Sequence, residues 1–259
     1  MKQLENKVVI VTGASSGIGY AAAKLFAHEG AKLVVSARRQ VQLDRLVSEI
    51  ATKGGQAVAH AGDIREEGTA QALVELAVGK FGGLDAAFNN AGQLGEMGET
   101  PEISLNGWRD TLETNLTSAF LGAKYQIPAM LARGVDGQRS GALLFTSSFV
   151  GTTVGMPGMA AYAAGKSGLN GLMRVLAAEY GPKGIRANSL LPGGTDTDAA
   201  AVVAHTPEIE EFVRGLHALK RIATPEEIAR TALFLLSDAA SFITGQAILA
   251  DGGVSINRT

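Results

Sequence analysis

Short apolar runs alternate with longer amphipathic segments along the whole chain. The runs are five to seven residues long, and they end in polar residues or glycine. Apolar runs of this length that end at turn residues are typical of strands buried on both faces of a sheet. We therefore predict seven strands, at 7–12, 32–37, 56–61, 84–89, 142–147, 185–191 and 246–250.

The segments between these strands carry apolar residues at helical spacing. The last predicted helix opens with Thr224, Pro225 and two glutamates, which combine a cap, a proline in the first turn and acids suited to the helix dipole. Regular alternation of strand and helix requires a parallel sheet with helices on both faces. We predict an α/β fold, a Rossmann-type doubly wound parallel sheet of about seven strands, with helices at 17–30, 41–53, 66–81, 104–133, 161–180 and 225–236.

No linker or internal repeat interrupts the alternation, so residues 1–259 are predicted to form a single domain. The least periodic stretch runs from 193 to about 205 and is rich in Gly, Thr, Asp and Ala. A structureless loop of this length inside a compact domain is usually functional. We expect it to form part of a lid over a site, with the lid region at about 193–216. His205 falls in this region and His217 directly follows it. A contact with substrate is one alternative for these histidines, and a solvated role is the one expected.

Composition excludes several classes of function. The net charge of -2 and the pI of about 6.1 give no electrostatic case for binding nucleic acid or an anionic membrane. The absence of cysteine excludes disulfides and thiol nucleophiles, and the four histidines form no metal-spaced cluster. The start of the chain lacks the apolar core of a signal peptide, and no apolar run approaches a membrane span. We expect a cytoplasmic protein with no metal site.

The stretch VTGASSGIG at 11–19 lies between the first strand and the first helix. Gly13, Gly17 and Gly19 allow a tight turn and a close approach of the backbone to a pyrophosphate. The free N–H groups and the dipole of the new helix favour the negative charge. Glycine turns of this kind also occur without a ligand, but the strand before and the helix after favour a dinucleotide site.

The end of the second strand bears on which dinucleotide binds. Ala37 stands where an acid would hold the ribose 2′-hydroxyl of NAD, and Arg38 and Arg39 follow it. Two guanidinium groups there suit a 2′-phosphate, which favours NADP(H) over NAD(H). Alternatively, both arginines are only the solvated start of the next helix.

YAAGK at 162–166 places Tyr162 and Lys166 one helical turn apart. Taken alone, this spacing also fits two side chains on a helix surface. Other motifs occur along the chain in a fixed order: TGASSGIG (12–19), GDI (62–64), NNAG (89–92), Asn115 in ETNLTSAF, TSSFVG (146–151), YAAGK, LLPGGTDTD (190–198) and ITGQAILADGG (243–253). In this order and spacing the chain resembles the short-chain dehydrogenase/reductase family over nearly its whole length.

The resemblance implies a catalytic set of Asn115, Ser148, Tyr162 and Lys166. Tyrosine is a poor base at neutral pH, and a lysine one turn away is expected to lower its pKa. Ser148 would place the substrate oxygen, with Ser147 as the alternative. Asn115 would hold, through a helix irregularity, a water that connects Lys166 to solvent. Gly165 departs from the serine usual in the family.

The resemblance also implies the residues that hold the cofactor. Asp63 would accept from the adenine amino group, and Thr195 and Thr197 would lie near the nicotinamide carboxamide or the pyrophosphate. The predicted cofactor-binding residues are Gly13, Ser15, Ser16, Gly17, Ile18, Gly19, Arg38, Arg39, Asp63, Ile64, Asn89, Ala91, Gly92, Tyr162, Lys166, Pro192, Gly193, Thr195 and Thr197.

The function expected from these motifs is an NADP(H)-dependent oxidoreductase that interconverts a secondary alcohol and a ketone. The alternatives are an NAD(H)-dependent enzyme of the same type and a dinucleotide-sensing protein without turnover. The helices at 104–133 and 161–180 carry long apolar faces that must be buried on the sheet or on a partner. In the family these two helices pair to form a dimer interface and the terminal strand often completes a tetramer, so the resemblance implies a homo-oligomer. Met156 and Met159 are candidates for the substrate pocket.

Overall fold

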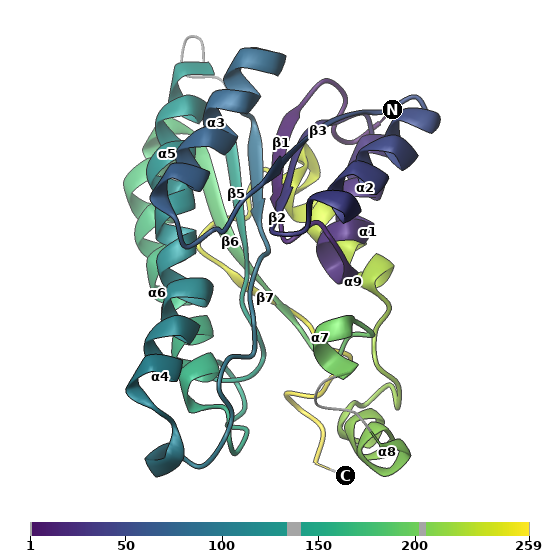
Figure 1. Ribbon diagram of the computed structural model, residues 1–259, viewed down its shortest axis with the longest axis vertical. Coiled ribbons are helices and arrows are strands. Elements are labelled where there is room, and N and C mark those ends of the chain that lie inside the picture. Colours follow the sequence, from purple (N-terminus) through teal and green to yellow (C-terminus); the bar gives the residue numbers. More distant parts are fainter. Residues whose placement is uncertain (1, 134–140, 202–205, 259) are drawn as a thin grey trace.

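Seven parallel strands form one sheet in a computed structural model that describes residues 2–133, 141–201 and 206–258 (Figure 1). The strand order is β3-β2-β1-β4-β5-β6-β7, and each neighbouring pair is parallel. The predicted fold class is confirmed, and each predicted strand lies within two residues of an observed one. The strands are β1 (Val8–Thr12), β2 (Lys32–Ala37), β3 (Gln56–Ala61), β4 (Ala86–Asn89), β5 (Gly141–Thr146), β6 (Ile185–Pro192) and β7 (Ala247–Ala250).

Helices cover both faces of the sheet (Figure 1). One face carries α1 (Gly17–His28), α2 (Gln40–Thr52) and α9 (Pro225–Leu236), and the other carries α3 (Glu67–Phe81), α5 (Ser118–Arg133) and α6 (Ala160–Tyr180). Within the described ranges, no helix is both long enough and apolar enough to cross a membrane.

The central strand β1 explains why the strand sequences are apolar throughout. Val9 and Val11 point into the core beneath α1 and α9, whereas Val8 and Ile10 point into the core beneath α3 and α5. All four side chains are fully buried. A strand covered on both faces has no solvent-facing side, so it shows no apolar–polar alternation.

The predicted helix at 104–133 is interrupted. It consists of α4 (Leu105–Leu112), a π-helical turn over Glu113–Thr117, and α5. Asn115 lies in the middle of this π-helical turn. Single π-helical turns inside α-helices are rare and are often found at functional sites.

The stretch predicted to lack periodicity contains a short helix, α7 (Asp198–Ala201), and the predicted lid continues into α8 (Pro207–Leu216). Both helices were missed. The start of α8 repeats the pattern seen at α9, because Thr206 caps the helix by accepting from the Ile209 N–H at 3.3 Å and Pro207 follows it. Residues 202–205, including His205, lie outside the described residues.

Gly165 is explained by close helix packing. It lies on the side of α6 that meets α4 and the π-helical turn. A Cβ added at Gly165 would lie 3.2 Å from the Asn115 Cβ and 3.6 Å from the Leu112 Cδ2. The missing side chain therefore lets the two helical segments approach closely beside Asn115.

Two glycines in helix interiors should respond differently to alanine. Gly79 in α3 is exposed with nothing within 4 Å of an added Cβ, so Gly79→Ala should raise the free energy of unfolding by about 0.5–1 kcal/mol. Gly165→Ala should gain less, because the new methyl group must displace the Asn115 side chain. Urea unfolding of both variants measures this difference, and equal gains would contradict the packing account.

Candidate active site

The carboxyl ends of the strands meet where the chain order reverses, between β1 and β4. In open α/β sheets this is where ligands bind. The Thr12 hydroxyl oxygen accepts from the N–H groups of Asn90 at 3.0 Å and Ala91 at 3.1 Å. The Asn90 amide donates to the Thr12 carbonyl at 3.2 Å, and its oxygen accepts from Thr146 at 3.0 Å. The loop after β4 is thereby tied to the ends of β1 and β5.

The glycine turn after β1 has the geometry of an anion cradle. Gly13 and Gly17 have φ angles of 68° and 54°, which favour glycine. A Cβ at Gly19 would lie 2.3 Å from the Gly13 carbonyl oxygen. Ser16 caps α1 without a side-chain hydrogen bond, and the first turn holds no acid. The turn therefore fits a pyrophosphate, with the backbone donors at the helix start left for the phosphate oxygens.

A guanidinium group lies directly against this turn. Arg39 donates from Nη2 to the hydroxyl oxygens of Ser15 at 3.0 Å and Ser16 at 3.1 Å. Both Arg38 and Arg39 are exposed, whereas Ala37 is buried at the end of β2. Positive charge thus stands beside the phosphate cradle, and no carboxylate occupies the position after β2.

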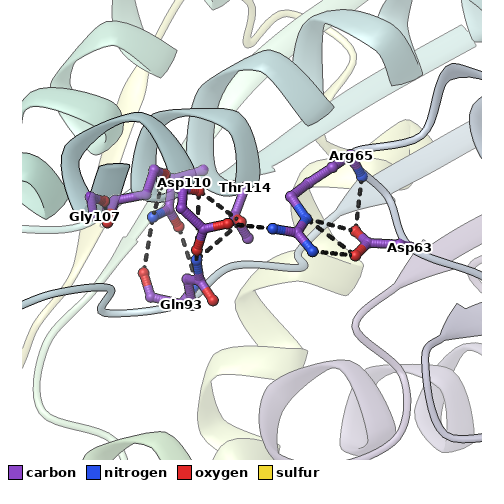
Figure 2. Close-up of polar contacts among 8 residues, drawn as sticks. Asp63, Arg65, Gln93, Gly107, Asp110 and Thr114 are labelled. Carbon is purple, nitrogen blue, oxygen red and sulfur yellow. Dashed lines mark hydrogen bonds and ion pairs between the residues drawn. The ribbon is translucent and has the colours of Figure 1, made fainter. Parts of the chain in front are cut away.

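Asp63, two residues after β3, is held by Arg65, which was not predicted as a site residue. Arg65 donates to the Asp63 carboxylate from Nε at 3.0 Å and from Nη2 at 2.6 Å (Figure 2). The same guanidinium donates from Nη1 to Asp110 in α4. Mainly because of the hydrogen bonds from Arg65, the pKa of Asp63 is lowered from its ordinary value. The carboxylate therefore stays ionised and oriented, with lone pairs remaining for another donor.

The contacts continue from Asp110 to Gln93 and Thr114 (Figure 2), and from Gln93 to Asn115. The Gln93 side-chain amide donates to Asp110 Oδ2 at 2.7 Å and to the Thr114 hydroxyl at 3.0 Å. The backbone N–H of Gln93 donates to Asn115 Oδ1 at 3.1 Å, and Asn115 Nδ2 donates to the Gln93 carbonyl at 2.8 Å. The Asn115 side chain is therefore committed to the loop after β4. The predicted helix irregularity at this residue is present, while the predicted water stays a prediction.

Lys166 is 3% exposed and lies beside the ring of Tyr162. Its Nζ donates to the Thr146 carbonyl at 2.7 Å and lies 5.8 Å from the centre of the Tyr162 ring. Burial lowers the pKa of Lys166 to about 8. Burial also raises the pKa of Tyr162, and a hydrogen bond with Ser148 partly offsets this.

Tyr162 therefore does not have the lowered pKa that was expected from its lysine neighbour. The pKa of Tyr162 is instead raised, with burial as the largest cause. The lysine ammonium is directed at the Thr146 carbonyl rather than at the phenol oxygen. Its own charge is also disfavoured by burial, which weakens its influence on the tyrosine.

The two neighbouring serines after β5 have different surroundings. The Ser147 hydroxyl donates a hydrogen bond to the Lys166 carbonyl at 2.7 Å, so it ties the end of β5 to α6. Ser148 accepts from the Val150 N–H at 3.1 Å and also hydrogen-bonds with Tyr162. Ser148 is thus the serine that faces Tyr162.

Gly92 provides the space in which Asn115 and Lys166 come together. A Cβ on Gly92 would lie 2.7 Å from Asn115 Oδ1 and 2.9 Å from Lys166 Nζ. Asn89, also predicted to bind cofactor, exchanges two side-chain hydrogen bonds of 2.9 Å with Gln126 in α5. Its amide is therefore occupied between the sheet and α5.

The segment after β6 lies across the glycine turn. A Cβ on Gly17 would come within 3.0 Å of the Thr197 Cγ2, so Thr197 packs over the cradle. The Thr195 hydroxyl donates back to the Gly193 carbonyl at 3.0 Å, and Thr195 is buried. Of the other predicted residues, Ile18 packs against the core beneath α1, and Ile64 is half-buried after β3.

An apolar cluster lies against Tyr162. Its buried members are Phe149, Val150, Met159 and Val254, and its half-buried members are Leu94, Val154, Met156, Ala163 and Leu216. Both candidate methionines therefore lie near Tyr162. Among the described residues, no group of three or more His, Cys, Asp or Glu side chains is arranged to hold a metal ion.

Proteins of known activity are similar to this chain in sequence over nearly its whole length. The family model described as Enoyl-(Acyl carrier protein) reductase matches residues 13–255. The chain is 42% identical to a cyclohexanol dehydrogenase of Acinetobacter over 250 residues, covering 96% of this chain and 95% of the relative. It is 39% identical to a 2,5-dichloro-2,5-cyclohexadiene-1,4-diol dehydrogenase of Sphingobium indicum, covering 98% of each.

The chain belongs to the short-chain dehydrogenase/reductase family. A solved structure of a 7α-hydroxysteroid dehydrogenase, complexed with NADH and 7-oxo glycochenodeoxycholic acid, is also similar. Its TM-score is 0.90 at 35% identity, covering 97% of this chain and 95% of that one. This short-chain dehydrogenase/reductase is accordingly an oxidoreductase that acts on CH–OH groups with a nicotinamide dinucleotide.

Burial of Lys166 predicts a pH dependence of stability. Up to a pH of about 8 the lysine is protonated in both the folded and the unfolded protein, so its burial opposes folding in full. Above that pH the folded protein releases the proton while the unfolded protein keeps it up to about 10.5, so unfolding takes up a proton. The free energy of unfolding should rise by about 2 kcal/mol between pH 8 and 9.5 through this group.

Urea unfolding of the ligand-free protein across this range measures the effect. Lys166→Met provides the comparison, because it keeps the apolar stem and removes the titrating group. The rise with pH should be smaller in the variant by about the stated amount. Parallel curves for the two proteins would mean that Lys166 is not the cause.

Proposed function

We propose that this protein is an NADP(H)-dependent oxidoreductase that interconverts a secondary alcohol and a ketone, with Tyr162 as the acid/base. The observation that carries the proposal is the grouping of Ser148, Tyr162 and Lys166 at the carboxyl edge of the sheet, between the glycine turn and an apolar cluster. Such a grouping provides a proton donor, a hydrogen-bond donor and a cation around one substrate oxygen.

In this proposal each residue acts on the substrate oxygen or on its neighbour. NADP(H), when bound, supplies or accepts the hydride. The Tyr162 hydroxyl donates its proton to the carbonyl oxygen during reduction and takes it back during alcohol oxidation. Ser148 donates a hydrogen bond to the same oxygen and stabilises the charge that develops there.

Lys166 and Asn115 serve the resupply of protons. A lysine whose pKa is about 8 exchanges its proton readily near neutral pH, so it suits a relay better than a fully solvated lysine does. We infer that Lys166 also holds the nicotinamide ribose. The π-helical turn at Asn115 supports the proposed water, because a π-helical turn leaves backbone groups outside the regular ladder.

The preference for NADP(H) rests on the two arginines after β2. Arg39 already lies against the serines of the glycine turn, and Ala37 brings no carboxylate that would repel a 2′-phosphate. The alternative is NAD(H), supported by the related 7α-hydroxysteroid dehydrogenase, which is complexed with NADH. The second alternative, a sensor without turnover, has no use for the hydrogen bond between Ser148 and Tyr162.

The substrate proposed is an apolar alicyclic secondary alcohol or its ketone. The cluster of Phe149, Met156, Met159 and Leu216 beside Tyr162 offers apolar contact surface. The names of the cyclohexanol and cyclohexadienediol dehydrogenases point to ring substrates of this kind. A panel of cyclic and linear ketones with NADPH tests this, and faster reduction of linear polar ketones would contradict it.

A homo-oligomer formed through α5 and α6 is proposed as well. Phe120 on α5 and Val175 on α6 are about half exposed, at 51% and 52%. Large apolar side chains on neighbouring helices favour association with a second copy. The lid role of 193–216 and the cytoplasmic location remain predictions.

Replacing the phenol hydroxyl should remove turnover and spare binding. Tyr162→Phe is expected to lower kcat by at least about 1000-fold in ketone reduction, with the Kd for NADPH within a few-fold of wild type. Tyr180→Phe, at the far end of the same helix, is the control and should retain activity. Steady-state kinetics and fluorescence titration give both quantities, and retained turnover in Tyr162→Phe would refute the mechanism.

The arginines should determine the choice of coenzyme. Arg38→Ala and Arg39→Ala should each lower kcat/KM for NADPH by about 10- to 100-fold, because a charge-assisted hydrogen bond to a phosphate is worth about 1.5–3 kcal/mol. The values for NADH should change little. Arg45→Ala in α2, an exposed arginine paired with Glu49, is the control. Equal use of NADH and NADPH by the wild type would show that the coenzyme assignment is wrong.

A further inference from the structure

His217 lies directly after α8 and is 2% exposed, so the expectation that it is solvated is wrong. Its Nε2 accepts from the backbone N–H of Gly194 at 2.9 Å. Its Nδ1 lies 2.8 Å from the Val213 carbonyl oxygen. Because the N–H group can only donate and the carbonyl can only accept, these partners define a neutral imidazole that carries its hydrogen on Nδ1.

Two glycines leave room for this ring. A Cβ on Gly194 would lie 2.8 Å from the His217 Cε1, and a Cβ on Gly252 would lie 3.2 Å from its Cδ2. Gly252 also has a φ of 58°, and its carbonyl accepts from the Leu219 N–H at 3.1 Å. The imidazole is therefore enclosed between the segment after β6 and the turn after β7.

The Gly194 peptide belongs to the segment that lies over the glycine turn. Its carbonyl accepts from the Ala223 N–H at 2.8 Å, and the Asp196 N–H donates to the Ala223 carbonyl at 2.9 Å. Backbone hydrogen bonds to Ala223 thus hold the Gly194 carbonyl and the Asp196 N–H, and the His217 side chain holds the Gly194 N–H. A buried N–H that loses its acceptor costs the folded state free energy, so the imidazole restrains this peptide.

We propose that His217 is a positioning residue that fixes the segment Gly193–Thr197 for the nicotinamide end of the cofactor and joins it to α8. This inference rests on the proposed function in one respect, namely that the segment contacts the cofactor. His217 itself touches neither substrate nor cofactor in this account. It acts through the Gly194 peptide and through Thr197, which packs over Gly17.

Two substitutions separate the hydrogen bond from the shape of the ring. His217→Gln places an amide oxygen at about the reach of Nε2, so it can still accept from Gly194. His217→Phe keeps a ring of similar size and has no acceptor. His28→Phe, on the exposed side of α1, is the control.

The expected result is a rise of about tenfold in the Kd and KM for NADPH in His217→Phe, with a smaller change in kcat. In His217→Gln both values should return to within about threefold of wild type. Fluorescence titration gives the Kd without any need for turnover. Hydrogen exchange of the ligand-free proteins should be faster over 193–197 in His217→Phe alone.

Each failure has a separate meaning. Wild-type affinity together with wild-type exchange in His217→Phe would overturn the inference, as would equal defects in the Phe and Gln variants. Wild-type protein that binds NADPH but reduces no ketone would overturn the proposed function, and the binding and exchange results would still decide the role of His217. Binding of no dinucleotide at all would overturn the positioning role.

Discussion

A buried ammonium group is the constraint around which this site is built. Lys166 is buried, and burial disfavours its charged form. The groups around its ammonium must therefore supply a hydrogen-bond acceptor and enough space for it. The Thr146 carbonyl accepts from Nζ, Gly92 leaves the space, and Ser147 anchors the helix that carries the lysine. One buried cation thus fixes the relative positions of three parts of the fold: the end of β5, the loop after β4 and α6.

That arrangement also connects the two ends of the crevice. Asp63 at the predicted adenine end and Asn115 beside Lys166 are joined through Arg65, Asp110 and Gln93. The exposed ion pairs in this series contribute little stability individually. Their value lies in geometry, because each side chain limits the positions of the next. A cofactor that touches one end would thereby meet a site whose other end is already ordered.

The fold could be predicted from the sequence because buried strands and amphipathic helices each produce a characteristic pattern of apolar positions within a short stretch of the chain. The glycine turn and the pair Tyr162 and Lys166 were likewise local. The contacts of Arg65 with Asp110 and of His217 with Gly194 were missed because they join residues 45 and 23 positions apart, where no periodicity connects them. The pairing of Arg65 with Asp63, two residues away, was local and could have been found. The predicted direction of the pKa shift of Tyr162 was wrong for a related reason, because the burial of a side chain depends on the whole fold. The start of α8 was local and could have been found from Thr206 and Pro207.

The π-helical turn at Asn115 limits which insertions and deletions the helical segment 105–133 can tolerate. Such a turn is an α-helix with one residue added, so a chain shorter by one residue here would form a regular helix. Every later side chain of α5 would then be rotated by about 100°. The face that buries Ala119, Ala123 and Ile127 against the sheet and the placement of Asn115 therefore depend on one residue count. Insertions and deletions in this helix cannot alter the site gradually: they keep both features or lose one of them.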